Sequence, residues 1–218
     1  MAALLAMAPQ YQLAWKPVVG ETHSYSVSVR FDYDPGALDI ESDLTLKVLS
    51  VDPKGNYRLR VTSKNATAKI GGETKPLDEQ QPSDQSFAAD GTPLDRSVRE
   101  ENKDGFSDLL NHLTVFQAPP HAIRVGDSWQ NRPSGPKTGF LGTPWITYRF
   151  AEIVKSAKSS YAKVRYEARH GLDPQAANGT LLLSRPNNAL YRLVVSILHF
   201  KPEGTAVEAT VDVVVQEK

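Results

Sequence analysis

The chain has 218 residues, with 25 basic and 25 acidic side chains and therefore no net formal charge. A protein that tracks along a nucleic acid needs a clustered basic surface, so the balanced charge argues against a nucleic-acid partner. No apolar run approaches the roughly 20 residues that a transmembrane helix requires, and we expect no transmembrane segment. Cysteine is absent, which excludes a thiol nucleophile and a thiolate metal site.

The first eight residues are small and apolar, and they end in Ala6-Met7-Ala8 just before Pro9. This resembles the end of a secretory signal with its small-x-small cleavage site, although the charged region is missing and the apolar core is short. We interpret residues 1–8 as a signal-peptide remnant and expect an exported protein, periplasmic or extracellular, with association with the cell envelope as one option. The alternative is an apolar N-terminal tail.

Strict alternation of apolar and polar residues dominates the chain and predicts some ten antiparallel strands with one buried and one solvated face. In the first run, Tyr25, Val27 and Val29 point one way while Ser24, Ser26 and Ser28 point the other. The alternating runs cover residues 24–33, 44–51, 57–61, 146–153, 161–166 and 207–215. The predicted fold class is therefore all-β and mainly antiparallel.

The run Leu190 to Phe200 is apolar on both faces, which predicts a central strand covered on its second face as well. One candidate cover is a helix from about Asp104 to Leu113, whose apolar residues recur with helical spacing behind an N-capping aspartate. The other candidate is a bound apolar ligand. The residues leave both options open.

Two segments, Trp15–Glu21 and Ile123–Trp129, introduce similar sets of alternating runs, and a recurring unit of roughly a hundred residues predicts two related halves. We expect one structural domain with a first β-rich half over residues 9–117 and a second over 118–218. The expected architecture is a strongly curved sheet or half-barrel, with one α-helix packed on its concave face.

The segment Ala118-Pro119-Pro120 followed by Val125-Gly126-Asp127-Ser128-Trp129 resembles a family of exported bacterial proteins of unknown function that carry a V-G-D-S-W motif. Trp15 to Glu21 is similar to an earlier element of that family, and Phe87 to Leu94 to a strand that ends in a D-G turn. Many members are lipoproteins, and the absence of cysteine departs from that pattern. At the level of the fold alone, the chain is also similar to the half-barrels of periplasmic lipoprotein and lipid carriers.

The motif Val125–Trp129 has a structural interpretation, in which Gly126 allows a tight turn, Asp127 accepts backbone N–H bonds and Trp129 is buried. A catalytic role for Asp127 and Ser128 is disfavoured, because no histidine lies at a recognisable spacing. The five histidines are scattered and form no metal-binding pattern. We therefore expect a protein that is not an enzyme and needs no metal or cofactor.

The loop from Asn131 to Pro144 carries Phe140 and Leu141, and Trp145 follows it directly. These three residues either fold over the core or form a flap at the mouth of an apolar cavity, and they are the candidate ligand-binding residues. The function we expect is non-enzymatic binding of an apolar or amphiphilic ligand, such as a lipid or acyl chain. The alternative is a cell-envelope structural or protein-interaction module, with envelope proteins as partners and no small-molecule ligand.

Overall fold

A computed structural model describes residues 8–78, 81–94, 116–131, 145–169, 177–200 and 208–218. These residues form eleven strands, and every strand pair is antiparallel. The all-β antiparallel class is thus confirmed. The strands are β1 (Thr22–Tyr33), β2 (Gly36–Val51), β3 (Tyr57–Ile70), β4 (Glu73–Pro76), β5 (Ser83–Phe87), β6 (Ser128–Asn131), β7 (Trp145–Lys155), β8 (Ser160–Arg169), β9 (Ala177–Ser184), β10 (Leu190–Phe200) and β11 (Ala209–Glu217).

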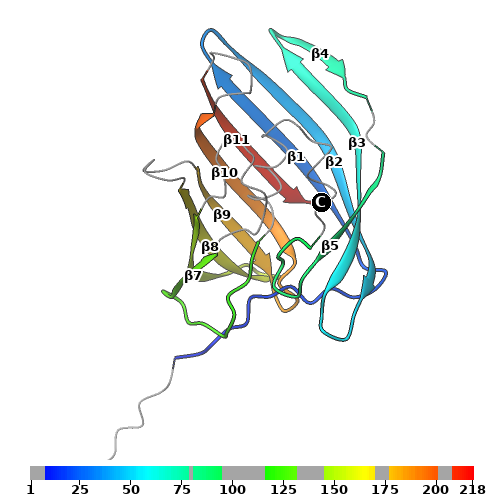
Figure 1. Ribbon diagram of the computed structural model, residues 1–218. Coiled ribbons are helices and arrows are strands. Elements are labelled where there is room, and N and C mark those ends of the chain that lie inside the picture. Colours follow the sequence, from blue (N-terminus) through cyan, green and yellow to red (C-terminus); the bar gives the residue numbers. More distant parts are fainter. Residues whose placement is uncertain (1–7, 79–80, 95–115, 132–144, 170–176, 201–207) are drawn as a thin grey trace, which may run out of the picture.

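All eleven strands belong to one open sheet, in the order β4-β3-β2-β1-β11-β10-β9-β8-β7-β6, with β5 paired to β3 off this path. Each half of the chain forms a meander, and the first strand of one meander pairs with the last strand of the other along nine residue pairs. Figure 1 shows the sheet twisted and curved, so that β7 and β8 turn away from the plane of β1 and β2. Both meanders therefore form one continuous sheet rather than two separate ones.

The inner face of the sheet, defined as the face that carries Tyr25 and Val29, holds the core. Val29 is 4% exposed and lies opposite Val213 of β11, whereas Ser28 on the outer face is exposed. The alternation read from the sequence is therefore correct on β1. A slip of one residue in this pairing would bring the whole apolar set to the solvent.

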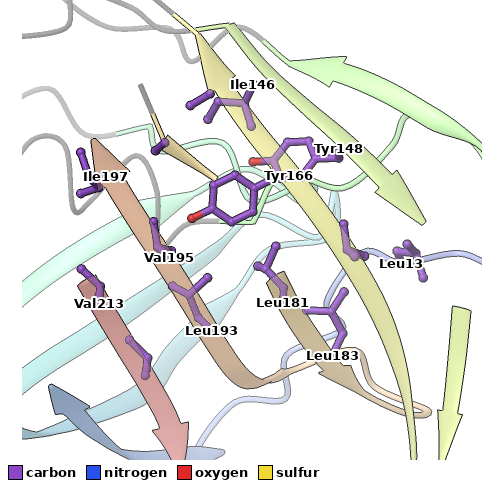
Figure 2. Close-up of a cluster of buried hydrophobic side chains, with 14 of the residues drawn as sticks. Leu13, Ile146, Tyr148, Tyr166, Leu181, Leu183, Leu193, Val195, Ile197 and Val213 are labelled. Atoms are coloured by element: carbon purple, nitrogen blue, oxygen red, sulfur yellow. The ribbon is translucent and has the colours of Figure 1, made fainter. Parts of the chain in front are cut away.

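The core extends without a break from β1 across β11 to β7. Its centre is fully buried, with Phe150, Val164 and Leu193 at 0% exposure. Figure 2 shows side chains of this centre, contributed by strands from β7 to β11 and by Leu13 near the N-terminus. Burial of this kind is the main source of stability, at about 25 cal/mol for each Å² of apolar surface removed from water.

β10 lies between β9 and β11, so its predicted central position is confirmed. Its outer face is less covered than the sequence predicts, because Val194 is 39% exposed. Phe200 lies on the buried inner face, 3% exposed, although simple alternation assigns it to the face of Val194. The register shift between Ile197 and Phe200 explains this, since a bulge reverses the facing of the residues beyond it.

The predicted helix from about Asp104 to Leu113 lies outside the described residues. Within the described residues, no helix is long and apolar enough to cross a membrane.

The ring of Tyr166 on β8 lies directly over Gly179 on β9, its cross-strand partner. A Cβ atom built on Gly179 would lie 2.5 Å from Cε1 of Tyr166 and 2.8 Å from its hydroxyl oxygen. Real Cβ atoms do not approach other atoms so closely. Glycine is therefore required at position 179 to make room for the aromatic ring, a device known for glycines in sheets.

Val29→Asp should destabilise the protein by roughly 3 kcal/mol or more, because it leaves a carboxylate unpaired in the core. The matched control is Ser24→Asp on the outer face of the same strand, opposite Thr45, which should change stability by less than about 0.5 kcal/mol. Urea unfolding measures both. Equal stability of the two variants would mean that the inner face of β1 is misassigned.

Gly179→Ala should destabilise the protein by about 1–3 kcal/mol, because the new methyl group overlaps the Tyr166 ring. Gly36→Ala is the control, since a Cβ there would meet only the Tyr33 ring at an ordinary 3.6 Å. Thermal unfolding followed by circular dichroism compares the two. A Gly179→Ala protein as stable as Gly36→Ala would contradict the described position of Tyr166.

Candidate functional site

Residues 11–20 form an N-terminal strap that crosses one end of the sheet (Figure 1). At its beginning, the N–H of Tyr11 donates to the carbonyl of Ile123 at 2.7 Å, and the N–H of Ile123 donates back at 3.0 Å. At its end, the N–H of Gly20 donates to the carbonyl of Val48 on β2 at 2.9 Å. Leu13, in the middle of the strap, is 1% exposed and packs into the core. The strap therefore closes this end of the sheet with an apolar side chain.

The turn between β9 and β10 holds the strap in place. Nδ2 of Asn188 donates to the carbonyls of Gln12 at 3.0 Å and Ala14 at 3.1 Å. The N–H of Lys16 donates to the carbonyl of Asn187 at 3.0 Å. Asn188 has a φ of 60° and is 5% exposed, and asparagine is among the few residues that adopt this left-handed conformation readily. Its side chain thus donates to two strap carbonyls at once and holds the strap against the turn.

A cluster of polar side chains around His23 lies on the inner face where the strap enters β1. Nδ1 of His23 is 2.7 Å from Oε1 of Glu217 on β11, and Nε2 is 2.9 Å from Oε1 of Glu21. Asn187 Nδ2 donates to the same Glu21 oxygen at 3.2 Å. A neutral imidazole has only one N–H, so both contacts are hydrogen bonds only when the ring is doubly protonated. His23 on β1 thus contacts Glu217 on β11 and Glu21, the residue that follows the strap.

Aromatic rings surround this cluster on the core side. The ring of Trp15 meets His23 edge-on at 5.7 Å between centroids and meets Tyr57 in the same way at 5.1 Å. Burial, followed by the charges of Glu217 and Glu21, raises the pKa of Tyr25, so its hydroxyl remains neutral and donates to the carbonyl of Leu190 at 3.0 Å. The arrangement suits a structural role, in which these side chains hold the strap, β1 and β11 together. Among the described residues, no group of three or more histidines and carboxylates could hold a metal ion.

The inner face of β1 and β2 differs from the rest of the core in its exposure. Five apolar side chains there are only half-buried, although they pack against the core cluster. This half-buried wall consists of Val27, Phe31, Ile40, Leu44 and Leu46. The corresponding inner residues of β7 to β10 are almost fully buried, as with Phe150 at 0% and Val195 at 1% exposure. The wall is thus apolar surface that the described core does not cover completely.

A shallow groove of about 650 Å³ lies at the other end of β1, around the hairpin between β1 and β2. Its lining includes Tyr33, Pro35 and Leu198. Arg30 crosses its rim and donates from Nε to Asp32 at 2.9 Å and from Nη1 to Asp39 at 3.1 Å. The hydrogen bond to Asp32 raises the pKa of the Arg30 guanidinium. The groove therefore combines apolar contacts with an ion network that is already paired.

The predicted ligand-binding residues are described only in part. Trp145 begins β7, is 48% exposed, and shares the outer face with Arg149, opposite the buried Ile146. Phe140 and Leu141 lie outside the described residues. The flap that these three residues were expected to form stays a prediction.

Side chains of the V-G-D-S-W motif make hydrogen bonds with backbone groups near the loop that contains it. The carboxylate of Asp127 accepts the N–H of Arg124 at 2.8 Å, and Trp129 is 8% exposed, with Nε1 donating to the carbonyl of Gln117 at 3.0 Å. Gly126 has a φ of 100°, a conformation that glycine adopts without strain. Each residue of the motif that was given a structural interpretation makes the corresponding contact, whereas Ser128 is exposed.

The segment from Val18 to Glu21 makes the same contacts in the other half of the chain. The carboxylate of Glu21 accepts the N–H of Val18 at 2.9 Å, and Gly20 has a φ of 87°. Gly20 and Glu21 exchange backbone hydrogen bonds with Val48, as Gly126 and Asp127 do with Phe150. In both places a register shift follows, after Val48 on β2 and after Phe150 on β7. The two loops thus share one geometry, while a common origin of the two halves stays a prediction.

Sequence reasoning missed the His23 cluster and the strap. Glu21 and His23 are two residues apart and thus share a face of a strand, which is a local signal. Glu217 is 194 residues from His23, and only the pairing of β1 with β11 brings it close. No protein-family model matches the chain, and no curated protein matches it.

Replacing Asn188 separates the contribution of its side chain from that of its backbone conformation. Asn188→Ala should cost about 2–3 kcal/mol, because two strap carbonyls lose their donor and alanine is strained at this φ. Asn188→Gly loses the same hydrogen bonds but tolerates the conformation, so it should cost roughly 1 kcal/mol less. Urea unfolding gives the free energies, and limited proteolysis reports release of the strap. If Asn188→Gly matched the wild type in both assays, the side chain would not hold the strap.

Proposed function

We propose that the protein is a non-enzymatic exported binding protein that holds an apolar or amphiphilic ligand, such as a lipid or acyl chain, on the inner face of its sheet. The observation that supports this proposal is the half-buried wall on β1 and β2, which continues the core surface but is less covered than the remainder. The strap and Leu13 close one end of this surface. A ligand would therefore enter from the end at which β1 and β2 turn into each other.

Apolar contact supplies the binding energy in this proposal. Each methylene transferred from water to the wall contributes about 0.8 kcal/mol before the cost of association is subtracted. The half-barrel shape, the helix predicted for residues 104–113 and the flap of Phe140, Leu141 and Trp145 belong to the same proposal, as cover for the wall. Export and the resemblance to the V-G-D-S-W family also remain part of it.

The second candidate is a cell-envelope structural or protein-interaction module. Apolar side chains on the outer face favour it, with Val194 at 39% and Trp145 at 48% exposure. A protein partner would bury this surface and would leave the inner wall without a ligand. Both candidates are non-enzymatic, and the location of binding separates them.

Native mass spectrometry of protein purified without detergent, followed by organic extraction, tests the first candidate. We expect a discrete added mass that extracts as lipid. The apo mass alone, together with no uptake of added lipid, would contradict lipid binding and favour the interaction module.

Ile40→Ser should weaken binding of the uncharged apolar dye N-phenyl-1-naphthylamine about tenfold, because it removes apolar contact from the wall; tenfold corresponds to about 1.4 kcal/mol. The matched control is Val194→Ser on the outer face, which should leave the affinity unchanged. Fluorescence titration measures the affinities, and thermal unfolding verifies that both variants are folded. An equal loss in the two variants, or none in either, would place the dye outside the wall.

A further inference from the structure

The hydroxyl group of Tyr166 is buried without a hydrogen-bond partner among the described residues. The residue is 3% exposed, and its neighbours on the inner face are apolar. A buried hydroxyl that makes no hydrogen bond costs free energy, because it gives up its hydrogen bonds to water and gains none. Such a group in a core needs an explanation.

The neighbouring Tyr148 shows the usual arrangement. The two rings are 5.9 Å apart between centroids, and in Figure 2 both hydroxyls point to the same side of the cluster. The hydroxyl of Tyr148 makes a hydrogen bond with the backbone of Gln117. Tyr166 therefore differs from a comparably buried tyrosine beside it in having no such partner within the described part of the chain.

The position of the Tyr166 ring is fixed by the sheet. Gly179 lies beneath the ring, and the residue that pairs with Gly179 on the next strand is Val195, which is 1% exposed. The hydroxyl thus lies over Gly179 on β9. A phenylalanine would fill the same space without the polar atom, so the space alone does not explain the tyrosine.

Tyr166 acts as a neutral donor over the physiological range. Burial, with a smaller effect of Tyr148, raises the pKa of the Tyr166 phenol well above its usual value. The proton therefore stays on the oxygen and is available for donation to an acceptor.

The surroundings restrict the charge of any acceptor. The charged residues of β8 lie on the outer face: Arg165, Glu167 and Arg169 are exposed, and Lys163 is half-buried and paired with Glu152. The described inner positions of β7 to β10 near Tyr166 carry no side chain that is charged at neutral pH, and Lys155, which has an inner register position, is exposed at the opposite end of β7. An ionised carboxylate beside Tyr166 would thus be a buried charge without a counter-ion, which is strongly unfavourable. An ester carbonyl accepts a hydrogen bond without carrying charge.

We propose that Tyr166 is the polar contact of the ligand site, and that its hydroxyl donates to the carbonyl oxygen of an uncharged acyl ester whose chain lies on the apolar inner face. This inference rests on the proposed function, namely that an apolar or amphiphilic ligand binds inside the sheet. It narrows the ligand class from any acyl lipid to neutral esters and excludes free fatty acids as preferred ligands.

The binding test displaces N-phenyl-1-naphthylamine with methyl laurate or with laurate at neutral pH, where laurate is ionised. The wild type should bind methyl laurate more tightly than laurate. Tyr166→Phe should weaken methyl laurate binding roughly five- to tenfold, the effect of one hydrogen bond, and should leave dye affinity unchanged. With a ¹³C-labelled ester carbonyl, the bound C=O stretch should move to lower frequency in the wild type only.

Thermal unfolding without ligand gives an independent readout. Tyr166→Phe should raise Tm by about 2–4 °C, because the variant no longer buries an unpaired hydroxyl. Tyr148→Phe is the matched control and should lower Tm, since its hydroxyl has a partner, while ester affinity stays the same. An unchanged or lower Tm for Tyr166→Phe would show that its hydroxyl is already paired and would overturn the proposal.

The outcomes separate the two proposals. If the wild type binds neither the dye nor methyl laurate, the proposed function fails and the assignment of Tyr166 fails with it. If the wild type and Tyr166→Phe bind methyl laurate equally, or if the wild type binds laurate better than methyl laurate, the binding function stands and the proposed role of Tyr166 is wrong.

Discussion

The pairing of β1 with β11 is the contact on which the other parts of the structure depend. It joins two meanders, one from each half of the chain, through nine residue pairs from Tyr25–Glu217 to Tyr33–Ala209. Without it, the half-buried wall on β1 and β2 would not be continuous with the core of β7 to β11. The same pairing places Glu217 beside His23, so the complete His23 cluster forms only when the first and last strands are joined.

The pairing of β1 with β11 also allows the strap to close one end of the sheet. The strap reaches from Ile123 before β6 to Val48 on β2, and thus spans both meanders at the end where His23 lies. Asn188 and Asn187 supply donors or acceptors at its middle, and Leu13 supplies apolar contact. The opposite end has no corresponding strap within the described residues. This asymmetry gives the inner face one closed end, and it is the reason for placing ligand entry at the hairpin of β1 and β2.

The strands were predictable because their signal is local. Alternation placed Tyr25, Val29 and Val213 on the inner face, and the structure agrees. Phe200 was assigned to the wrong face because a bulge leaves no trace in the hydrophobic pattern. The His23 cluster and the orphaned hydroxyl of Tyr166 depend on contacts between distant strands, which periodicity cannot reveal. The helix expected near residues 104–113 and two of the three expected ligand-binding residues lie outside the described residues, so they remain predictions.

An open sheet can extend by strand addition, because the backbone N–H and C=O groups on the free side of an outermost strand can pair with another extended chain. Among the described residues the outermost strands are short: β4 with four residues and β5 with five lie beside β3, and β6 with four lies at the other side. β4 also carries Glu73, Lys75 and Pro76, and a proline on an edge lacks the N–H that an incoming strand needs. The short strands at both sides, together with the charges and the proline of β4, oppose edge-to-edge addition of further copies. The open sheet therefore carries its half-buried apolar wall while its short outer strands limit the backbone that is available as a template for aggregation.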